Sequence, residues 1–480
     1  MNEINKTLFV QGVRCPKLVY LVSKYPETVA PDSLGVEFRK KQGISVGELA
    51  KELYSNGIDL TNYSDETKIK ETKRLKDQVL FEASVKYDEF FVRADILVPN
   101  NDGSHNIIEV KGDSEIKEEH IPDVSFQKYI FEKAGYKISK VYLAHANNEY
   151  LKQGKIDPNQ FFKIEDVTEQ LIPIEDSIQI IRDSLSKTTI PEIKISRQCT
   201  KPYDCSFKDE CWSFLPKNNV MQLYYDKKLG FKLLDEKILL IKDIPNDIEL
   251  KGRGAKQREI QIKTTKENYI HIEKEEIKKY IDSLVYPIYY FDFETYASAI
   301  PIFDNSRPWQ KIPFQYSLHI EYENGTIDHK EFLATDNNDP RLALIESIKK
   351  DLGKTGSIVV FNQTFEKTIL KELGIDHPKS EKDIEELLPR IVDLASPFEQ
   401  FHYYNPEQQG RYSIKVILPL FSDLTYKKME VGNGEEAFCT YEKIMKNPEN
   451  KDQLIKSLKE YCKLDTLAEV EITKKLREMI

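Results

Sequence analysis

Residues 286–295 read YPIYYFDFET, and this stretch decides how the second half of the chain folds. Its aromatic and isoleucine side chains are typical of a buried strand. Alternate residues of a strand share a face, so Asp292 and Glu294 point one way and Phe291 and Phe293 the other. Two carboxylates on one face of a buried strand repel each other and are costly to desolvate, and a metal ion relieves both penalties. The alternative is that both emerge at the strand's solvent-exposed end.

Two later motifs add acids to this pair. VVFNQTFEKTIL (359–370) runs from a strand into a helix and brings Asn362 and Glu366, and YCKLDTLAEVEI (461–472) places Tyr461 and Asp465 on one face of the last long helix. Asp393, in RIVDLASPF, is a second candidate that we rank below Glu366.

In this order the motifs resemble the DnaQ-like DEDD 3′–5′ exonucleases of the tyrosine-bearing subtype. They also resemble an uncharacterised domain family found attached to RecB-like nucleases, and the likeness extends over most of 281–480. It implies an RNase H-like fold, with Tyr461 orienting the attacking water. Glu366 stands where the family usually has aspartate, which puts the rate in doubt more than the fold. The implied ligands of two Mg²⁺ or Mn²⁺ ions are Asp292, Glu294, Glu366 and Asp465.

Two further features of this half have both a binding and a structural interpretation. Ser413 and Lys415, in GRYSIK, are candidates for contacts with a substrate strand, although a helix N-cap is the preferred role for Ser413. The aromatic run FHYYN (401–405) suits stacking on unpaired bases, and packing in the core explains it equally well.

The first half carries a second acidic constellation. VLFEASVKYD (79–88) and EFFVRADILV (89–98) predict a hairpin, and HNIIEVK (105–111) predicts the next strand. On these strands Asp95 and Glu109 lie close enough to share a hard divalent cation, with Lys111 beside them to orient the nucleophile or offset developing charge. This pattern is weak alone, because acid–lysine pairs are common at strand ends.

Four cysteines frame this constellation. Cys15 lies before it, and CTKPYDCSFKDECW (199–212) follows with Cys199, Cys205 and Cys211. All-thiolate coordination suits a [4Fe–4S] cluster or zinc, and the sequence alone does not separate them. Unligated, buried cysteines are the remaining alternative. Cys439 and Cys462 lie far away and are expected to be ordinary buried thiols.

Together these features resemble RecB-like PD-(D/E)xK nucleases, in the branch with an iron–sulfur cluster that includes the CRISPR adaptation nucleases. The resemblance covers about 1–216 and favours [4Fe–4S] over Zn²⁺. Two departures concern the cysteine spacing, C-x5-C-x5-C instead of the commoner C-x2-C-x5-C, and Phe131 where the glutamine motif usually has tyrosine. The implied catalytic residues are Asp95, Glu109, Lys111 and Gln127, with Tyr129 near the site and Glu48 as a further metal ligand where the branch often has histidine.

The whole chain is expected to be an α/β protein: a restriction-endonuclease-like mixed-sheet domain (1–216), a connector (217–280) and an RNase H-like domain (281–480). At 480 residues several domains are expected. The net charge of −10 argues against bulk attraction to nucleic acid, so any phosphate-binding surface must be local. The basic stretch 251–266 has two interpretations, a solvated connector or a phosphate-binding arm with Arg253, Lys256 and Arg258.

Neither a secretory signal nor a membrane span is evident, which predicts a soluble, cytoplasmic protein. The leading hypothesis is a metal-dependent nuclease with two catalytic domains, acting on DNA rather than RNA, in end trimming, repair or defence against foreign DNA. One alternative is an RNA-processing exonuclease whose first domain only binds substrate. Another is a non-catalytic nucleic-acid-binding or assembly subunit.

Overall fold

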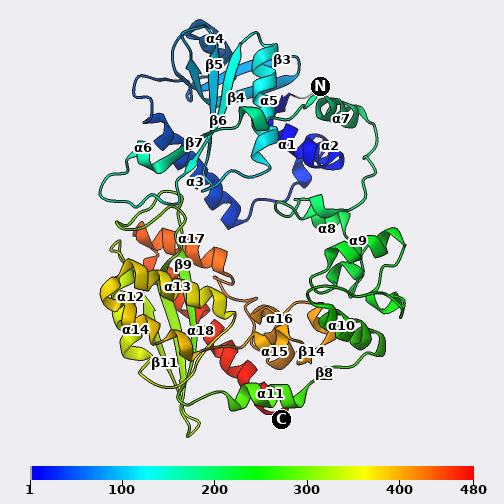
Figure 1. The fold of residues 1–480 in the computed structure, drawn as a ribbon, viewed down its shortest axis with the longest axis vertical. Coiled ribbons are helices and arrows are strands. Elements are labelled where there is room, and N and C mark those ends of the chain that lie inside the picture. The colour runs from blue at the N-terminus through cyan, green and yellow to red at the C-terminus, as the bar shows by residue number, and fades with distance from the viewer. Residues whose placement is uncertain (1–2) are drawn as a thin grey trace. The chain divides into compact units, whose positions relative to one another are not determined.

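The computed structural model describes residues 3–480, and its chain divides into two compact units, each with its own mixed sheet (Figure 1). The first unit comprises Met1–Ser213 with Ala297–Gln310, and the second comprises Phe214–Tyr296 with Lys311–Ile480. The α/β class predicted from the sequence is therefore confirmed. No helix among residues 3–480 is long and apolar enough to cross a membrane.

The sheet of the first unit has the order β2-β3-β4-β5-β6-β7, and β1 pairs with one end of β4. Its strands are β1 (Ile4–Asn5), β2 (Ile58–Asp59), β3 (Leu80–Tyr87), β4 (Phe90–Pro99), β5 (His105–Lys111), β6 (Ile138–Ala146) and β7 (Phe162–Asp166). The pairs β3–β4 and β4–β5 are antiparallel, whereas β5–β6 is parallel. The predicted hairpin and third strand are thus present.

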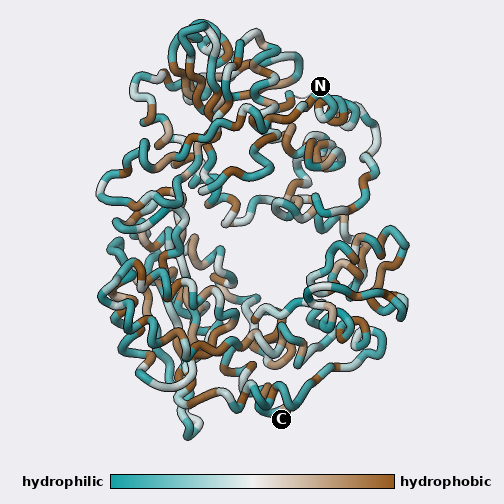
Figure 2. The backbone as a smooth tube through the Cα atoms, in the orientation of Figure 1, coloured by the Kyte–Doolittle hydropathy of each residue, from teal (hydrophilic) through white to brown (hydrophobic). Residues whose placement is uncertain are grey.

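Helices cover both faces of this sheet. Phe9, Phe126 and Ile181 place α1, α5 and α7 in one core, while Val46 and Ala50 place α3 in the core of the opposite face. The helices are α1 (Lys6–Arg14), α2 (Pro16–Lys24), α3 (Leu34–Lys51), α4 (Asp65–Arg74), α5 (His120–Lys133), α6 (Pro158–Phe161), α7 (Glu175–Ser186) and α8 (Lys208–Cys211). Helix α2 is largely brown in Figure 2 because it carries the apolar residues Leu18, Val19, Leu21 and Val22.

A short segment that follows β9 in the sequence belongs to the first unit. Within residues 297–310, the Ala299 N–H donates to Gln42 Oε1, and Trp309 Nε1 donates to the carbonyl oxygen of Gly112 at 2.6 Å. The position of Gly112, one residue after Lys111, is therefore held by a side chain distant in sequence.

The sheet of the second unit has the order β11-β10-β9-β12-β13. The strands β9, β10 and β11 are antiparallel, and β12 and β13 continue parallel to β9. The strands of this unit are β8 (His271–Ile272), β9 (Ile288–Tyr296), β10 (Ile312–Glu321), β11 (Ile327–Leu333), β12 (Ile358–Val360), β13 (Ile391–Asp393) and β14 (Tyr403–Tyr404).

Strand β9 has the alternation that its sequence predicts. Phe291 and Phe293 enter the core under α12 and α13, whereas Tyr290 enters the core against α18. The helices that build this unit's two faces are α11 (Lys274–Asp282), α12 (Arg341–Asp351), α13 (Gln363–Asp376), α14 (Glu381–Glu385), α15 (Ser396–Glu399), α16 (Ile414–Phe421), α17 (Gly434–Met445) and α18 (Lys451–Arg477). Asp292 and Glu294 therefore face α18.

The stretch 217–280, expected as a connector, is folded and lies within the second unit. It contains α9 (Lys227–Asp235), α10 (Ala255–Glu267) and α11, and Val220, Leu233 and Ile262 belong to a core of their own. The hydrophobic spacing of these helices was hidden by their high lysine content.

Candidate active site

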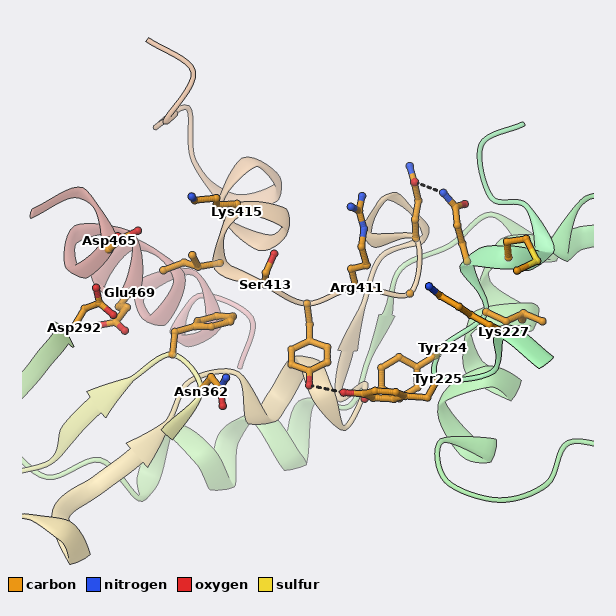
Figure 3. A pocket seen from close by; sticks show the side chains of 18 of the residues that line it. Tyr224, Tyr225, Lys227, Asp292, Asn362, Arg411, Ser413, Lys415, Asp465 and Glu469 are labelled. Atoms are coloured by element: carbon orange, nitrogen blue, oxygen red, sulfur yellow. Dashed lines mark hydrogen bonds between the residues drawn. The ribbon is translucent and has the colours of Figure 1, made fainter. Parts of the chain in front are cut away.

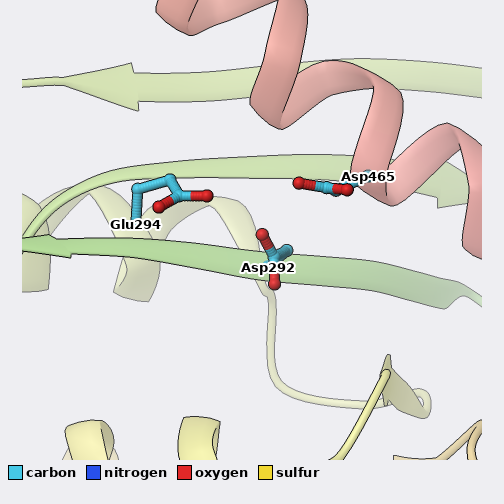
Figure 4. Close-up of side chains that lie close together, drawn as sticks. All are labelled: Asp292, Glu294 and Asp465. Carbon is cyan, nitrogen blue, oxygen red and sulfur yellow. The ribbon is translucent and has the colours of Figure 1, made fainter. Parts of the chain in front are cut away.

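Three carboxylates of the second unit converge where β9 meets α18 (Figure 4). One oxygen from each of Asp292, Glu294 and Asp465 lies within 4.8 Å of the other two, and no other such cluster of three ligand atoms occurs within residues 3–480. Asp292 is half-buried, and the other two are buried. Hard carboxylate oxygens at this separation are a ligand set that a divalent cation prefers. The set predicted from YPIYYFDFET and the last helix is thus assembled.

The electrostatics of this cluster are those of acids that lack a counter-ion. Burial, reinforced by the charge of Asp465, raises the pKa of Glu294 to about 8, and burial raises the pKa of Asp465 to about 6. Burial and the same neighbours hold the pKa of Asp292 well above its usual range. A bound cation would remove the repulsion that keeps these protons in place.

These pKa shifts predict how metal binding depends on pH. The folded chain keeps protons that the unfolded chain, with carboxyl pKa values near 4, has released, so its stability falls as the pH rises from about 4 to about 8. Mn²⁺ that displaces these protons is expected to raise the melting temperature by roughly 5 °C more at pH 8 than at pH 6. Differential scanning fluorimetry with Mn²⁺ or EDTA measures this difference. Equal shifts at the two pH values would contradict it.

Two tyrosines and a lysine surround Asp465. The hydroxyl of Tyr426 donates to Asp465 Oδ1 at 2.7 Å, and Tyr461, one turn earlier on α18, also lowers the carboxyl pKa by hydrogen bonding. Burial raises the pKa of both phenols, which therefore stay protonated as donors. Lys415 lies over both rings, at 5.1 and 5.5 Å, and its charge lowers the pKa of Asp465 and Glu294.

Sequence reasoning missed Glu469. It lies four residues after Asp465 on α18, lines the same cavity, and has a buried Oε2 with no hydrogen-bond partner among the described residues. Burial and the charge of Asp292 hold its pKa well above the usual range, and Figure 3 shows its carboxylate beside Asp292. The i, i+4 spacing from Asp465 was the signal that could have found it.

Glu366 and Asp393 do not line the cavity. Burial, Asp465 and Glu294 raise the pKa of Asp292, and the charge of Glu366 nevertheless adds to this shift, so Glu366 lies near this site. Glu366 is 2% exposed on α13 and is not among the residues that line the cavity; burial raises its pKa to about 8. Asp393 accepts hydrogen bonds from the backbone N–H groups of Asn362, Gln363 and Ala395, so it fixes the start of α13. The ranking of Glu366 above Asp393 as a metal ligand stays a prediction.

Two smaller expectations have definite outcomes. Ser413 occupies the N-cap position of α16, but its side chain makes no capping hydrogen bond and lines the cavity instead. In the run FHYYN, Phe401, Tyr403 and Tyr404 are at most 3% exposed. These rings therefore pack in the core and are not accessible for stacking on bases.

The acids of the first unit also meet, with lysines between them. The register that pairs Ile96 with Ile108 makes Asp95 and Glu109 the next opposed pair of β4 and β5. Lys111 Nζ lies 2.9 Å from Glu109 Oε1, and Gln127 Nε2 donates to Glu109 Oε2 at 2.8 Å. Burial and the charge of Glu109 raise the pKa of Asp95 to about 7. Asp95, Glu109, Lys111 and Gln127 are therefore one cluster.

Two members of this cluster were not predicted. Lys6, at the start of α1, lies 2.5 Å from Glu109 Oε1, and Asp123 on α5 accepts from Lys111 at 2.6 Å. The i−4 spacing from Gln127 could have indicated Asp123. No local signal could have found Lys6, because the pairing of β1 with β4 brings it there.

Two other predicted neighbours lie elsewhere. Glu48 is exposed on α3 and pairs with Lys51 at 2.7 Å, away from Asp95 and Glu109. Tyr129 lies two residues after Gln127, on a different face of α5, with the Lys133 ammonium 5.1 Å from its ring centroid. Glu48 is thus engaged by Lys51, and its role as a further metal ligand stays a prediction.

The four framing cysteines line one apolar cavity, together with residues such as Leu18 and Phe207. All are free thiols, and burial raises the pKa of Cys205, with Cys15 and Cys199 close enough to add to it. No three of the sulfurs approach within 4.8 Å of one another. Tetrahedral zinc, with Zn–S distances near 2.3 Å, needs a tighter set, whereas a cubane spreads its ligands over four irons. Cys439 and Cys462 are buried thiols of the second unit, as expected.

The basic stretch departs from its expected role at one position. Arg258 is 1% exposed and donates to the carbonyl oxygens of Tyr224, Arg253 and Lys251, so it holds its own loop instead of meeting a phosphate. Lys256 pairs with Glu273 at 3.2 Å, and Arg253 is exposed above the ring of Tyr225. Of the three predicted phosphate-binding residues, Arg253 and Lys256 present their charge at the surface and Arg258 does not.

Comparison with known proteins adds relatives but no activity. Residues 289–413 match the family model described as a domain of unknown function, DUF2779. This match begins within β9 and ends at Ser413, so it includes Asp292, Glu294 and Glu366 but not Asp465.

The chain is 33% identical over 171 residues to the uncharacterized protein UU173 of Ureaplasma parvum, covering 30% of this chain and 24% of that protein. It is 28% identical over 215 residues to the uncharacterized protein MG366 of Mycoplasma genitalium, covering 40% of this chain and 32% of that one. The chain thus spans about a quarter to a third of these relatives. A solved structure titled "Crystal structure of SSO0001" aligns over 45% of this chain and 88% of that chain, at 17% identity and a TM-score of 0.26.

Proposed function

We propose that this chain is a divalent-metal-dependent nuclease whose principal catalytic centre is the carboxylate cluster of the second unit. The observation that carries the proposal is the convergence of Asp292, Glu294 and Asp465 to within 4.8 Å at the end of a cavity of about 910 Å³. Clustered acids beside an open cavity suit phosphodiester hydrolysis, in which metal ions and substrate phosphate meet. The ordered motifs that resemble the DEDD exonucleases support the same reading.

Each residue of this centre has a role that its surroundings suggest. Asp292, Glu294 and Asp465 would hold two Mg²⁺ or Mn²⁺ ions, with Glu469 beside them. When bound, these ions would polarise the scissile phosphate and acidify the attacking water. The hydroxyl of Tyr426 donates to the Asp465 carboxylate and orients it. Tyr461 lines the same cavity, and the resemblance implies that it orients the attacking water. Lys415 lines the cavity over the rings of Tyr426 and Tyr461, where it would meet the substrate phosphate.

We infer a second centre in the first unit, where Asp95, Glu109 and Lys111 have the arrangement of the PD-(D/E)xK resemblance. A specific observation favours another candidate for this unit, a site that binds nucleic acid without cleaving it. The Lys6 ammonium lies 2.5 Å from Glu109 Oε1, in the position beside this oxygen that a bound metal ion would need. A cationic side chain there lowers the affinity for a metal ion by like-charge repulsion.

The cysteine cavity is proposed to hold a [4Fe–4S] cluster, with Zn²⁺ as the alternative. Arg14, Lys17 and Lys208 line the same cavity and would offset the negative charge of four thiolates. The proposed role is structural, because Cys15 lies between α1 and α2 near the start of the first unit, whereas the other three cysteines follow α7. DNA as substrate and a role in end trimming, repair or defence rest on the resemblance. The proposed cytoplasmic setting rests instead on the hydropathy of the sequence.

Digestion of end-labelled DNA and RNA with Mg²⁺ or Mn²⁺ tests this function. We expect wild-type protein to release short products that EDTA abolishes, Asp465→Asn to remove one set of products, and Asp95→Asn to remove a different set. Unchanged products from Asp95→Asn would leave the first unit as a binding domain. No metal-dependent cleavage of any substrate would contradict the nuclease proposal and favour a non-catalytic subunit.

A further inference from the structure

The cavity that ends at the carboxylates is larger than a pair of metal ions requires. It measures about 910 Å³ and extends to Tyr225, Lys227, Arg411 and Tyr412, residues that we call the distal wall. Figure 3 shows the acids at one end and the distal wall at the other. Pockets of this size enclose whole organic ligands, so the distal wall has room to contact parts of a substrate remote from the reacting phosphate.

An exposed aromatic ring dominates the distal wall. Tyr225 is 57% exposed, in contrast to the buried Tyr224 beside it, and its φ of +50° is a backbone conformation that non-glycine residues rarely adopt. Its hydroxyl lies 3.2 Å from that of Tyr412, and the Arg253 guanidinium lies 4.9 Å from its ring centroid. A strained, exposed ring that neighbours hold in place is a feature of binding sites rather than of packing.

Two cations complete the distal wall. Lys227 and Arg411 are exposed, line the cavity, and make no ion pair with any described residue. The chain as a whole carries a net charge of −10, so a local pair of exposed cations stands out against it. Unpaired cations beside an exposed aromatic ring are the combination that binds the phosphates and bases of a single strand.

We propose that the distal wall binds the unpaired end of a single nucleic-acid strand, with a base stacked on Tyr225 and phosphates bound by Lys227 and Arg411. The inference rests on the proposed function, since it names the form of substrate that the carboxylates would receive. A cavity of about 910 Å³ has the size that encloses a whole organic ligand, so we expect one strand rather than a double helix to enter it. The part of the chain expected to be a connector would thus supply substrate contacts through Tyr225 and Lys227, not through Arg258.

Fluorescence anisotropy with labelled 12-nucleotide dT and rU strands and a blunt duplex tests the distal wall, in Ca²⁺ so that binding is measured without turnover. We expect Tyr225→Ala to weaken single-strand binding roughly tenfold, because stacking is lost. Tyr225→Phe keeps the ring and loses only the bond to Tyr412, so its binding should stay within about twofold. Lys227→Ala should reduce the slope of log binding constant against log salt concentration by the amount expected for about one phosphate contact. Lys228 is an exposed neighbour that does not line this cavity, so Lys228→Ala should leave the slope unchanged.

Several outcomes would overturn the inference: Tyr225→Ala binding like wild type, equal losses in Tyr225→Ala and Tyr225→Phe, or a duplex bound as tightly as a single strand. Lys227 is exposed, so Lys227→Ala is expected to fold even if Tyr225→Ala does not. An unchanged salt dependence of binding in Lys227→Ala would then overturn the inference. Preference for dT or for rU identifies the strand, and either supports the inference. Binding with this pattern but without hydrolysis in Mn²⁺ would defeat the nuclease proposal alone, and hydrolysis unaffected by Tyr225→Ala would defeat the distal wall alone.

Discussion

Replacing Asp292 with asparagine is expected to lower metal-dependent hydrolysis at least about a thousandfold, because one carboxylate of the metal-binding set is lost while side-chain volume is kept. Such a loss corresponds to about 4 kcal/mol of transition-state stabilisation, within what a metal ion contributes to a developing charge. Initial rates on an end-labelled single strand at saturating Mn²⁺ measure it.

The same substitution is expected to stabilise the metal-free protein at pH 8. Asp292 lies beside Asp465 and Glu294, and its removal relieves repulsion that the wild-type chain tolerates. A variant with less activity and a higher melting temperature in EDTA is the signature of a functional cluster rather than a structural one. Asp328→Asn, on the exposed strand β11, serves as the control and should change neither quantity. A lower melting temperature for Asp292→Asn would contradict this account.

Cys205→Ser is expected to remove the bound cluster and destabilise the first unit. A link from Cys15 to the cysteines after α7 closes a loop of more than 180 residues, and by analogy with a disulfide such a closure contributes about 5 kcal/mol. Anaerobically purified wild type should contain about four irons and four sulfides per chain, the composition of one [4Fe–4S] cluster. The variant should lose them, together with their visible absorption, and its first unit should be digested sooner in limited proteolysis.

Cys439→Ser is the matched control, since that thiol is buried in the second unit. It should leave the metal content unchanged. If wild type contains one zinc per chain and no iron, the cavity holds Zn²⁺ and the [4Fe–4S] assignment is wrong. If wild type contains no metal and is as stable as Cys205→Ser, the cysteines are unligated thiols.

Local pattern was enough for the elements that carry the candidate sites. Alternation in YPIYYFDFET placed Asp292 and Glu294 on one face because successive side chains of a strand point in opposite directions, whatever the rest of the chain does. Helical spacing likewise placed Tyr461 and Asp465 together on α18. Antiparallel pairing of neighbouring strands, joined by a short connection, then brought Asp95 opposite Glu109.

Local pattern failed where the partner lies far away in the sequence. Lys6 reaches Glu109 only because β1 pairs with β4, and Tyr426 reaches Asp465 from the loop between α16 and α17. Arg258 looked like a surface cation because its sequence neighbours are basic. Its burial depends on carbonyl oxygens presented by a loop and by Tyr224, which no spacing rule anticipates.

The sequence by itself determined the α/β class, the two acidic constellations and the cysteine set, because each follows from side-chain periodicity or from residue chemistry. Only the tertiary structure decided which acids meet in one cluster, that 217–280 is a folded part of the second unit, and that 297–310 packs in the first. It also decided which tyrosines face the cavity. The physical reason is that burial and electrostatic coupling depend on distances through space, and those are set by packing between segments that are remote along the chain.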